Sequence, residues 1–154
     1  MENTLPHGGF IKGKTHYLPI RIYYADTDFS GIVYHGRYVE FMERGRTEAL
    51  RAFGLLQKIA AEAAAAAANA AAPVPEPVLF AVSKLNLEFK VPAYIDNLLL
   101  VETAIEKLTG ARFFIRQRIF RGETLLTDGT CCLALISRTG RPRRIPDNWR
   151  ALFD

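Results

Sequence analysis

The residues with the clearest chemical potential lie between positions 24 and 38, where acids, a histidine, glycines and tyrosines are concentrated. Asp26, Asp28 and His35 are the titratable acids and the histidine of this stretch, and Gly31 and Gly36 interrupt it. A carboxylate can act as a nucleophile or a general base, and a histidine can transfer protons near neutral pH. Loop aspartates more often stabilise turns by accepting backbone hydrogen bonds, so the acids alone do not establish catalysis.

A strand is predicted before this stretch and a helix after it. Residues 18 to 24 alternate apolar and polar side chains, the period-two pattern of a strand with one buried face. Pro19 lacks an amide donor, which places it near the start of that strand or on an edge. Residues 26 to 31 break the pattern with turn-forming residues and predict a loop.

The predicted helix begins near His35. Apolar residues recur after it at helical spacing, and charged residues occupy the opposite side. Glu40 and Arg44 stand four apart in the favourable order for an ion pair on a helix. Gly54 can adopt positive φ just past the last turn, so we expect one helix of about 18 residues.

The remaining chain is strand-like after residue 85. Period-two or β-rich runs cover residues 85–91, 98–107, 112–121 and 124–137, with short connections that favour antiparallel neighbours. The sequence therefore predicts an α+β fold with an antiparallel sheet of about five strands whose apolar face packs on one long helix. One helix cannot cover a large sheet, so we expect a partner subunit and a homo-oligomer.

With 154 residues, the chain is expected to form a single domain, 1–154. Residues 1–15 lack periodicity and predict a loose N-terminal arm. Residues 57–77 are rich in alanine and proline, and we expect a helical extension or a mobile insertion without chemistry. Residues 139–154 form a basic C-terminal tail.

The spacing of the central motif resembles a known family. The matching residues are Tyr24, Asp26-Thr27-Asp28, Gly31, Val33-Tyr34-His35 and Tyr38, followed by Glu43-Arg44-Gly45-Arg46-Thr47-Glu48. They resemble the hotdog-fold thioesterases of the 4-hydroxybenzoyl-CoA thioesterase type, in particular the acyl-CoA thioesterases associated with the Tol-Pal system. The resemblance extends over residues 17–138 in element order and is sharp across 24–51, and the alanine-rich insertion departs from it.

The resemblance implies a hotdog fold, in which the sheet wraps around the central helix, and hydrolysis of acyl thioesters without a cofactor. It makes Asp28 the catalytic carboxylate, either as nucleophile or as general base, with Asp26 shaping the loop. His35 would orient the acid or the water, or protonate the leaving thiolate, and Tyr24 would face Asp28. The amides of residues 34–37 would form the oxyanion hole. The expected substrate-binding residues are Gly31, Val33, Tyr34, Gly36 and Tyr38.

Several alternatives remain open at this point. Glu43 is the main rival carboxylate, because other hotdog thioesterases place their acid on the central helix. A hotdog protein can also bind an acyl thioester as a sensor or adaptor without cleaving it, and fold alone does not choose between these functions. A hydratase or dehydratase on the same fold would resemble a different, histidine-bearing helix signature that this chain lacks.

Charge and composition bound the expected partners. Arginines gather at 112–121 and 138–150, which suits the phosphates of an acyl-CoA or an acyl carrier protein, although a solvated basic surface explains them equally. No helix-turn-helix or aromatic RNA-binding signature supports nucleic acid as a partner. The histidines share no ligand-like spacing with acids or cysteines, so no metal site is predicted.

The expected location is the cytoplasm. The N-terminus lacks the apolar core of a secretory signal, and no apolar run has the length of a transmembrane segment. Cys131 and Cys132 are adjacent and cannot easily pair with each other, which predicts reduced packing residues in a reducing compartment. We expect a homotetramer, with a dimer of dimers favoured.

Overall fold

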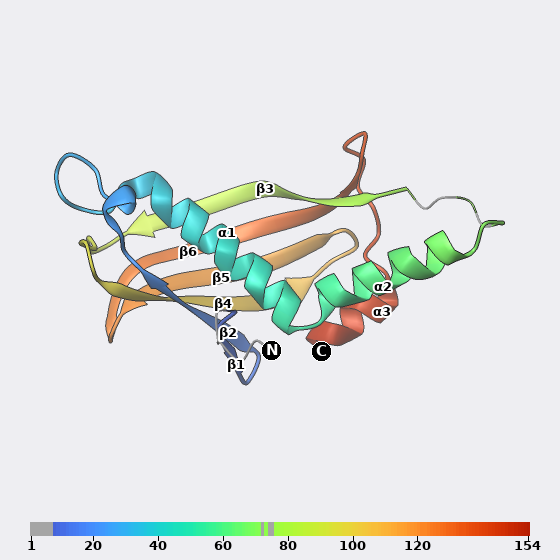
Figure 1. The fold of residues 1–154 in the computed structure, drawn as a ribbon, viewed down its shortest axis with the longest axis horizontal. Coiled ribbons are helices and arrows are strands. Elements are labelled where there is room, and N and C mark those ends of the chain that lie inside the picture. Colours follow the sequence, from blue (N-terminus) through green and yellow to red (C-terminus); the bar gives the residue numbers. More distant parts are fainter. Residues whose placement is uncertain (1–7, 72, 74–75) are drawn as a thin grey trace.

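The protein is an antiparallel sheet with helices on one face (Figure 1). The structure, a computed structural model, describes residues 8–71, 73 and 76–154. The strands are β1 (Phe10–Lys12), β2 (Thr15–Arg21), β3 (Val78–Phe89), β4 (Leu98–Leu108), β5 (Arg112–Arg121) and β6 (Thr124–Ser137). Their order in the sheet is β1-β2-β4-β5-β6-β3, and every neighbouring pair is antiparallel.

The helices are α1 (His35–Ala52), α2 (Leu55–Ala68) and α3 (Asp147–Arg150), with short 3-10 turns η1 (Tyr24–Asp26) and η2 (Ala151–Phe153). α1 crosses the sheet, and α2 continues from it toward the other end of the molecule (Figure 1). Gly54 adopts φ +91° between α1 and α2, a conformation that glycine reaches without steric cost. None of the described helices has the length and apolar character needed to span a membrane.

The sheet contains six strands rather than the expected five. The additional strand is β1, which lies in the segment predicted to be a loose arm and pairs with β2, with Phe10 opposite Tyr17. The two rings stack at 5.4 Å, and Gly13 adopts φ +63° in the connecting turn. The expectation of a loose arm is therefore wrong for residues 10–12, because a glycine turn lets a short strand pair locally. Residues 1–7 lie outside the described part.

The first predicted strand is displaced by three residues. It was expected at 18–24, but β2 spans Thr15–Arg21 and Tyr24 belongs to η1. The side chain of Asp26 accepts a hydrogen bond from the Tyr23 amide at 2.8 Å, which turns the backbone out of the extended conformation. Ile22 still bonds with the segment before β4, its amide donating to the Asn97 carbonyl at 2.9 Å.

The hydrophobic core has two parts on the helix side of the sheet. Beneath the first half of α1, Phe41 and Met42 pack with residues of β2, β4 and β6. Beneath α2 and α3, Leu55 and Trp149 pack with residues of β5 and β6. No helix of the described chain covers the opposite face of the sheet (Figure 1). The sheet thus presents the loop between β2 and α1 at one end and the α2–α3 layer at the other.

The C-terminal segment folds back onto its own chain. Ile145 and Trp149 of the predicted basic tail are buried, and the Trp149 indole donates to the Glu62 carboxylate at 3.1 Å. Glu62 belongs to the alanine-rich segment 57–77, of which residues 57–68 lie in α2. This contact anchors α2, which otherwise has few large side chains to bury.

Candidate active site

Asp26 shapes the loop that leads into α1. Its carboxylate accepts from the Tyr23 amide, and its carbonyl accepts from the Tyr34 amide at 2.9 Å. Its carboxylate also lies 3.7 Å from Nε of Arg37. Both acceptor groups of Asp26 are therefore occupied by the chain itself, which is the structural role expected for this residue.

A tight reversal follows, with Asp28 at its start. The Asp28 amide donates to the Ile32 carbonyl at 3.0 Å, and the Gly31 amide donates to the Asp28 carbonyl at 3.0 Å. Gly31 adopts φ +83°, so its place in the motif follows from backbone conformation. Thr27 and Val33 pair on either side of the reversal. The loop is thus a closed local structure, and the Asp28 side chain is exposed on it.

The Asp28 carboxylate has one occupied and one free oxygen. Oδ1 accepts from the Ser30 amide at 2.8 Å and from the Ser30 hydroxyl. These two bonds, with a smaller contribution from the nearby His35 charge, hold the pKa of Asp28 below its ordinary value. Oδ2 has no hydrogen-bond partner among the described residues. The side chain therefore stabilises the turn and still presents an ionised oxygen.

The first turn of α1 lies next to this loop and supplies free amides. The Tyr34 amide donates to Asp26, and the Arg37 amide donates to the Tyr34 carbonyl at 2.9 Å. The amides of His35 and Gly36 have no acceptor among the residues that the structure describes. Such unpaired amides at a helix N-terminus are suited to bind an oxyanion. Two of the four amides expected for the oxyanion hole are therefore available.

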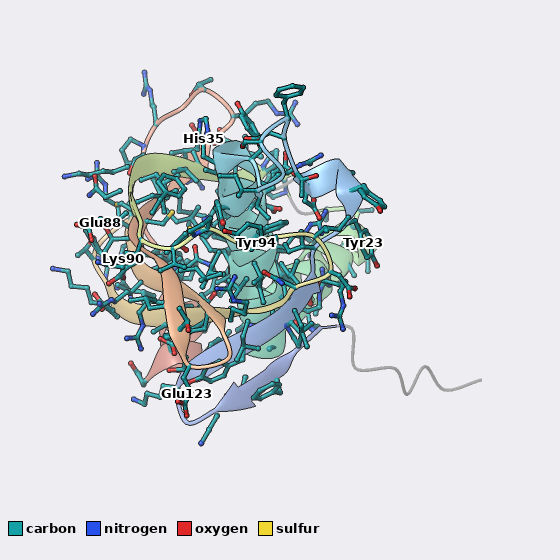
Figure 2. All side chains as sticks on the ribbon, turned by 90° about the vertical axis from the view of Figure 1, so that its left-hand side faces the viewer. Tyr23, His35, Glu88, Lys90, Tyr94 and Glu123 are labelled. Atoms are coloured by element: carbon teal, nitrogen blue, oxygen red, sulfur yellow. The ribbon has the colours of Figure 1, made fainter. Side chains whose placement is uncertain are left out.

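Aromatic rings surround the start of α1. The imidazole of His35 is exposed, with its ring centroid 4.5 Å from that of Tyr34 and 6.3 Å from that of Phe89 on β3. A Cβ at Gly36 would lie 2.7 Å from Cε1 of Tyr34, so the glycine accommodates this ring. Figure 2 looks onto this end of the molecule, where His35 and Tyr94 lie on the near side. The site is an exposed, partly apolar surface that includes the edge strand β3.

Three comparisons with known proteins bear on this geometry. Residues 30–127 match the family model described as the thioesterase superfamily. The chain belongs to the thioesterase superfamily. It is 35% identical over 136 residues to the acyl-CoA thioesterase YbgC of Haemophilus influenzae, covering 88% of this chain and 91% of that protein. It is also 35% identical over 137 residues to the acyl-CoA thioester hydrolase YbgC of Escherichia coli O157:H7, covering 88% and 92%.

Solved structures agree with the family assignment and the hotdog fold. A probable thioesterase from Bartonella henselae superposes with a TM-score of 0.71 at 42% identity, covering 87% of this chain and all of that one. The hotdog fold expected from the sequence is therefore confirmed for this thioesterase, with the strand number corrected from five to six.

The structure separates the predicted site residues of this thioesterase into two groups. Asp28, Gly31, Tyr34, His35 and Gly36 lie together at the loop and the first turn of α1. Val33 and Tyr38 lie in the core, and Tyr24 lies away from the carboxylate.

Tyr38 and Val33 are buried. The Tyr38 hydroxyl accepts from the Ala93 amide at 3.2 Å, and burial raises the pKa of this tyrosine. The Val33 amide donates to the Ala93 carbonyl at 2.9 Å. Both residues fasten the loop and the helix start to the segment before β4, so they support the site from beneath.

Tyr24 is 85% exposed in η1. Its carbonyl accepts from the Thr27 amide and hydroxyl, but among the described residues no hydrogen bond joins its own hydroxyl to Asp28. The structure thus does not bring the Tyr24 hydroxyl onto the carboxylate within one chain.

The rival carboxylate Glu43 lies eight residues beyond His35, about 12 Å along α1. It is exposed and accepts from the Thr47 hydroxyl at 2.9 Å. It lines a cleft of about 510 Å³ between α1 and β2, together with Arg44 and Asp26. Glu43 and Asp28 therefore belong to different places on the surface.

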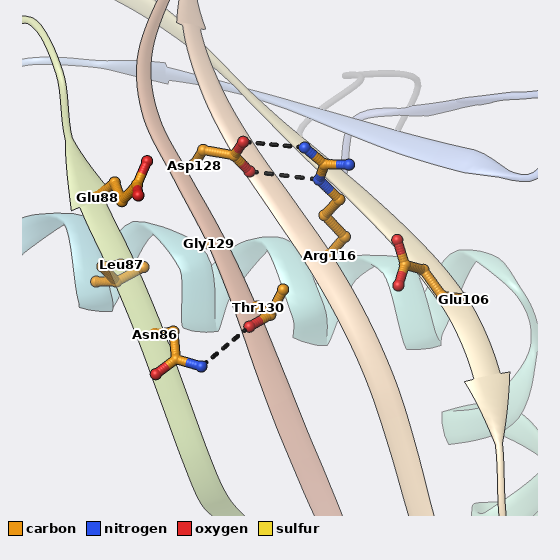
Figure 3. Close-up of a pocket in the computed structure, with 8 residues that line it drawn as sticks. All are labelled: Asn86, Leu87, Glu88, Glu106, Arg116, Asp128, Gly129 and Thr130. Atoms are coloured by element: carbon orange, nitrogen blue, oxygen red, sulfur yellow. Dashed lines mark hydrogen bonds and ion pairs between the residues drawn. The ribbon is translucent and has the colours of Figure 1, made fainter.

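Other clefts lie away from the loop. One of about 400 Å³ opens on the sheet face opposite α1, where Arg116 pairs with Asp128 at 2.9 Å beside Glu88 (Figure 3). Another, of about 580 Å³, lies between α2, the start of β3 and the C-terminal segment that ends in α3. It has two acids: Glu62 is bonded to Asn148 and Trp149, and Glu76 is paired with Arg143 at 2.7 Å. Among the described residues, no group of three or more His, Cys, Asp or Glu side chains could hold a metal ion.

Sequence reasoning missed two residues of the site. Ser30 supplies both hydrogen bonds to Asp28, and a serine two positions after an aspartate is a recognisable turn signal. Phe89 lies within the alternating run 85–91, is the last residue of β3, and meets the rings of His35 and Tyr38. The approach of Phe89 has no local signal, because 54 residues separate it from His35 along the chain.

Proposed function

We propose that this thioesterase hydrolyses acyl thioesters, acyl-CoA among them, with Asp28 as nucleophile or general base and the amides of His35 and Gly36 as the oxyanion hole. One observation carries the proposal: an ionised carboxylate with a free Oδ2 adjoins a helix start with two unpaired amides. The relatives named as acyl-CoA thioesterases support the reaction.

The chemistry needs only groups of this kind. Oδ2 of Asp28 attacks the thioester carbonyl carbon, or removes a proton from a water that attacks it. The carbonyl oxygen becomes an oxyanion and accepts from the two amides, which stabilise it more than the ground-state carbonyl. The carbon–sulfur bond then breaks, and the thiolate receives a proton: in the general-base route the one that Asp28 took from water, passed directly or through His35, and otherwise one from water. If Asp28 attacked directly, water hydrolyses the resulting anhydride and restores the carboxylate.

The thiol carrier is proposed to be coenzyme A or the phosphopantetheine arm of an acyl carrier protein. Arg138 and Arg141 lie beyond β6 and form no ion pair with the described residues. Arg143 and Arg144 are instead paired with Glu76 and Asp147. The free guanidinium groups favour a phosphate-bearing partner.

A thiol-release assay across acetyl, medium-chain, long-chain and aromatic acyl-CoA substrates tests the function. Turnover with at least one of them is expected. Tight binding of acyl-CoA without release of thiol would instead establish a sensor or adaptor. Repeating the assay with acyl carrier protein thioesters shows whether the enzyme prefers coenzyme A or acyl carrier protein as the thiol carrier.

We further propose that the protein works as a homo-oligomer, a dimer of dimers, in the cytoplasm. β3 is a 12-residue strand at the edge of the sheet, and its residues Leu79, Val82 and Phe89 are 44%, 47% and 52% exposed. A long apolar edge of this kind favours pairing with another chain. Both cysteines are free and buried, in keeping with a reducing compartment. Sedimentation equilibrium should give the mass of a tetramer, and a monomer mass would contradict the proposal.

A further inference from the structure

A polar network lies between α1 and the sheet, inside an otherwise apolar core. Gln117 of β5 is 1% exposed and makes three hydrogen bonds. Its Nε2 donates to the Met42 carbonyl of α1 and to the Thr103 hydroxyl of β4, each at 2.9 Å. Its Oε1 accepts from Nη1 of Arg46 at 3.0 Å. One side chain thus ties two sites on α1 to two strands.

The helix approaches the sheet closely at the same place. A Cβ at Gly45 would lie 2.7 Å from Cγ1 of Val101 and 3.0 Å from both Nε2 of Gln117 and Oγ1 of Thr103. Glycine is therefore required for this contact, and it brings the helix backbone within reach of the Gln117 amide. The network and the close approach fix the same point along α1.

Arg46 is expected to lower the stability of the fold. Its side chain is only 7% exposed, and no carboxylate of the described chain pairs with it. A buried cation without a counter-charge destabilises a fold, whereas apolar residues of similar volume would be neutral or stabilising. Stability alone therefore does not account for a charged group here. Buried polar groups that cost stability can instead select one register of packed elements.

We propose that Arg46, Gln117 and Thr103 form a polar clamp that positions α1, and through it the amides of its first turn, for thioester hydrolysis. Apolar contacts are not directional, so they alone do not fix how far α1 slides or rotates on the sheet. Hydrogen bonds to the Met42 carbonyl and the Arg46 guanidinium fix both movements.

The clamp reaches the site through the helix itself. Met42 lies seven residues after His35, about 10 Å along a rigid helix, so a shift at Met42 moves the first-turn amides equally. The Asp28 loop is anchored on Ala93 through Val33, and Tyr38 of α1 bonds to the same residue. The distance between the carboxylate and the amides then depends on how α1 is held between Ala93 and the clamp. This inference rests on the proposed function, because it concerns the same reaction.

The test replaces the whole clamp by apolar side chains in the variant Arg46→Met, Gln117→Met, Thr103→Val of the full chain. The melting temperature is expected to stay the same or rise, since no buried polar group is left unpaired. With an acyl-CoA that the wild type turns over, kcat should fall at least about tenfold while KM changes little, as expected for misplaced catalytic groups. A kcat equal to that of the wild type in the folded variant overturns the clamp.

Two control variants separate loss of the clamp from loss of a surface charge and from a general loss of stability. Arg44→Met removes a neighbouring exposed arginine of α1 and should leave kcat unchanged. Ile145→Val weakens the core near α3 and should lower the melting temperature without lowering kcat.

If the triple variant does not fold, the single variant Gln117→Glu tests the clamp instead. It retains an acceptor for Arg46 but loses the donor to Met42, so kcat should fall, and an unchanged kcat refutes the clamp. If the wild type turned over none of the thioesters, the proposed function itself would be refuted. Failure of the clamp proposal is therefore distinguishable from failure of the proposed function.

Discussion

Replacing Asp28 by asparagine should abolish most of the turnover while leaving the loop intact. In Asp28→Asn, the remaining Oδ1 can still accept from the Ser30 amide and hydroxyl, which are the only side-chain bonds of Asp28 within the described chain. The NH₂ group replaces Oδ2, the oxygen that is free. The substitution therefore removes the negative charge and the reactive oxygen without breaking the turn.

The size of the loss distinguishes the two roles of Asp28. Loss of a general base costs roughly a hundredfold to ten-thousandfold in rate. Loss of a nucleophile can cost on the order of a millionfold in kcat. We expect a fall in kcat of at least about a hundredfold, measured by thiol release under saturating acyl-CoA. A loss near the upper figure would identify Asp28 as the nucleophile.

The matched control is Asp96→Asn, the same chemical change on a different loop. Asp96 adopts φ +66°, which asparagine tolerates well, and its carboxylate is exposed. This variant should keep wild-type turnover and an unchanged melting temperature. If Asp28→Asn also retained wild-type kcat, the carboxylate would have no catalytic role and Glu43→Gln would become the next variant to measure.

Three further predictions follow from the same structure. The pKa of Asp28 is lowered from 3.8, so its reactive, ionised form persists above the lowered pKa and is lost as pH falls through it. The value of kcat/KM should therefore hold into mildly acidic pH. Ser30→Ala removes a hydrogen bond that lowers this pKa, so it should move the acidic limb of the pH profile to higher pH. Gly129→Ala should destabilise the protein by about 1–3 kcal/mol in urea unfolding, because a Cβ would lie 2.5 Å from Cδ2 of Leu87; an unchanged midpoint would contradict this. Trp149→Ala should cost about 3–5 kcal/mol, since it removes a buried ring and its bond to Glu62, and an unaffected unfolding midpoint would show that α3 does not stabilise α2.

The repeating patterns of the sequence predicted most elements. Helical spacing after His35 and the glycine at 54 matched α1, and the runs 112–121 and 124–137 matched β5 and β6. Local patterns succeed here because each depends on which side chains share a face, which is set by the backbone period. β1 was missed because three residues are too few to show a period, and β2 shifted because the Asp26 carboxylate ended the strand.

The site was predictable only as a group of residue types. The motif located Asp28, the helix start and the required glycine at Gly31, because turn and helix-start conformations are local. It assigned ligand contacts to Tyr38 and Val33, which the structure places in the core. A single alternating or helical position does not reveal which face meets the sheet.

By itself, the sequence determined the order of elements, the tight Asp28 reversal and the supply of a carboxylate, an imidazole and free amides near one another. Tertiary structure alone decided that Phe89 meets His35, that Ala93 fastens Tyr38, and that Gln117 ties α1 to two strands. The physical reason is range: backbone turns and caps act over a few residues. The three contacts named above join residues more than 50 positions apart, and they depend on how the whole core packs.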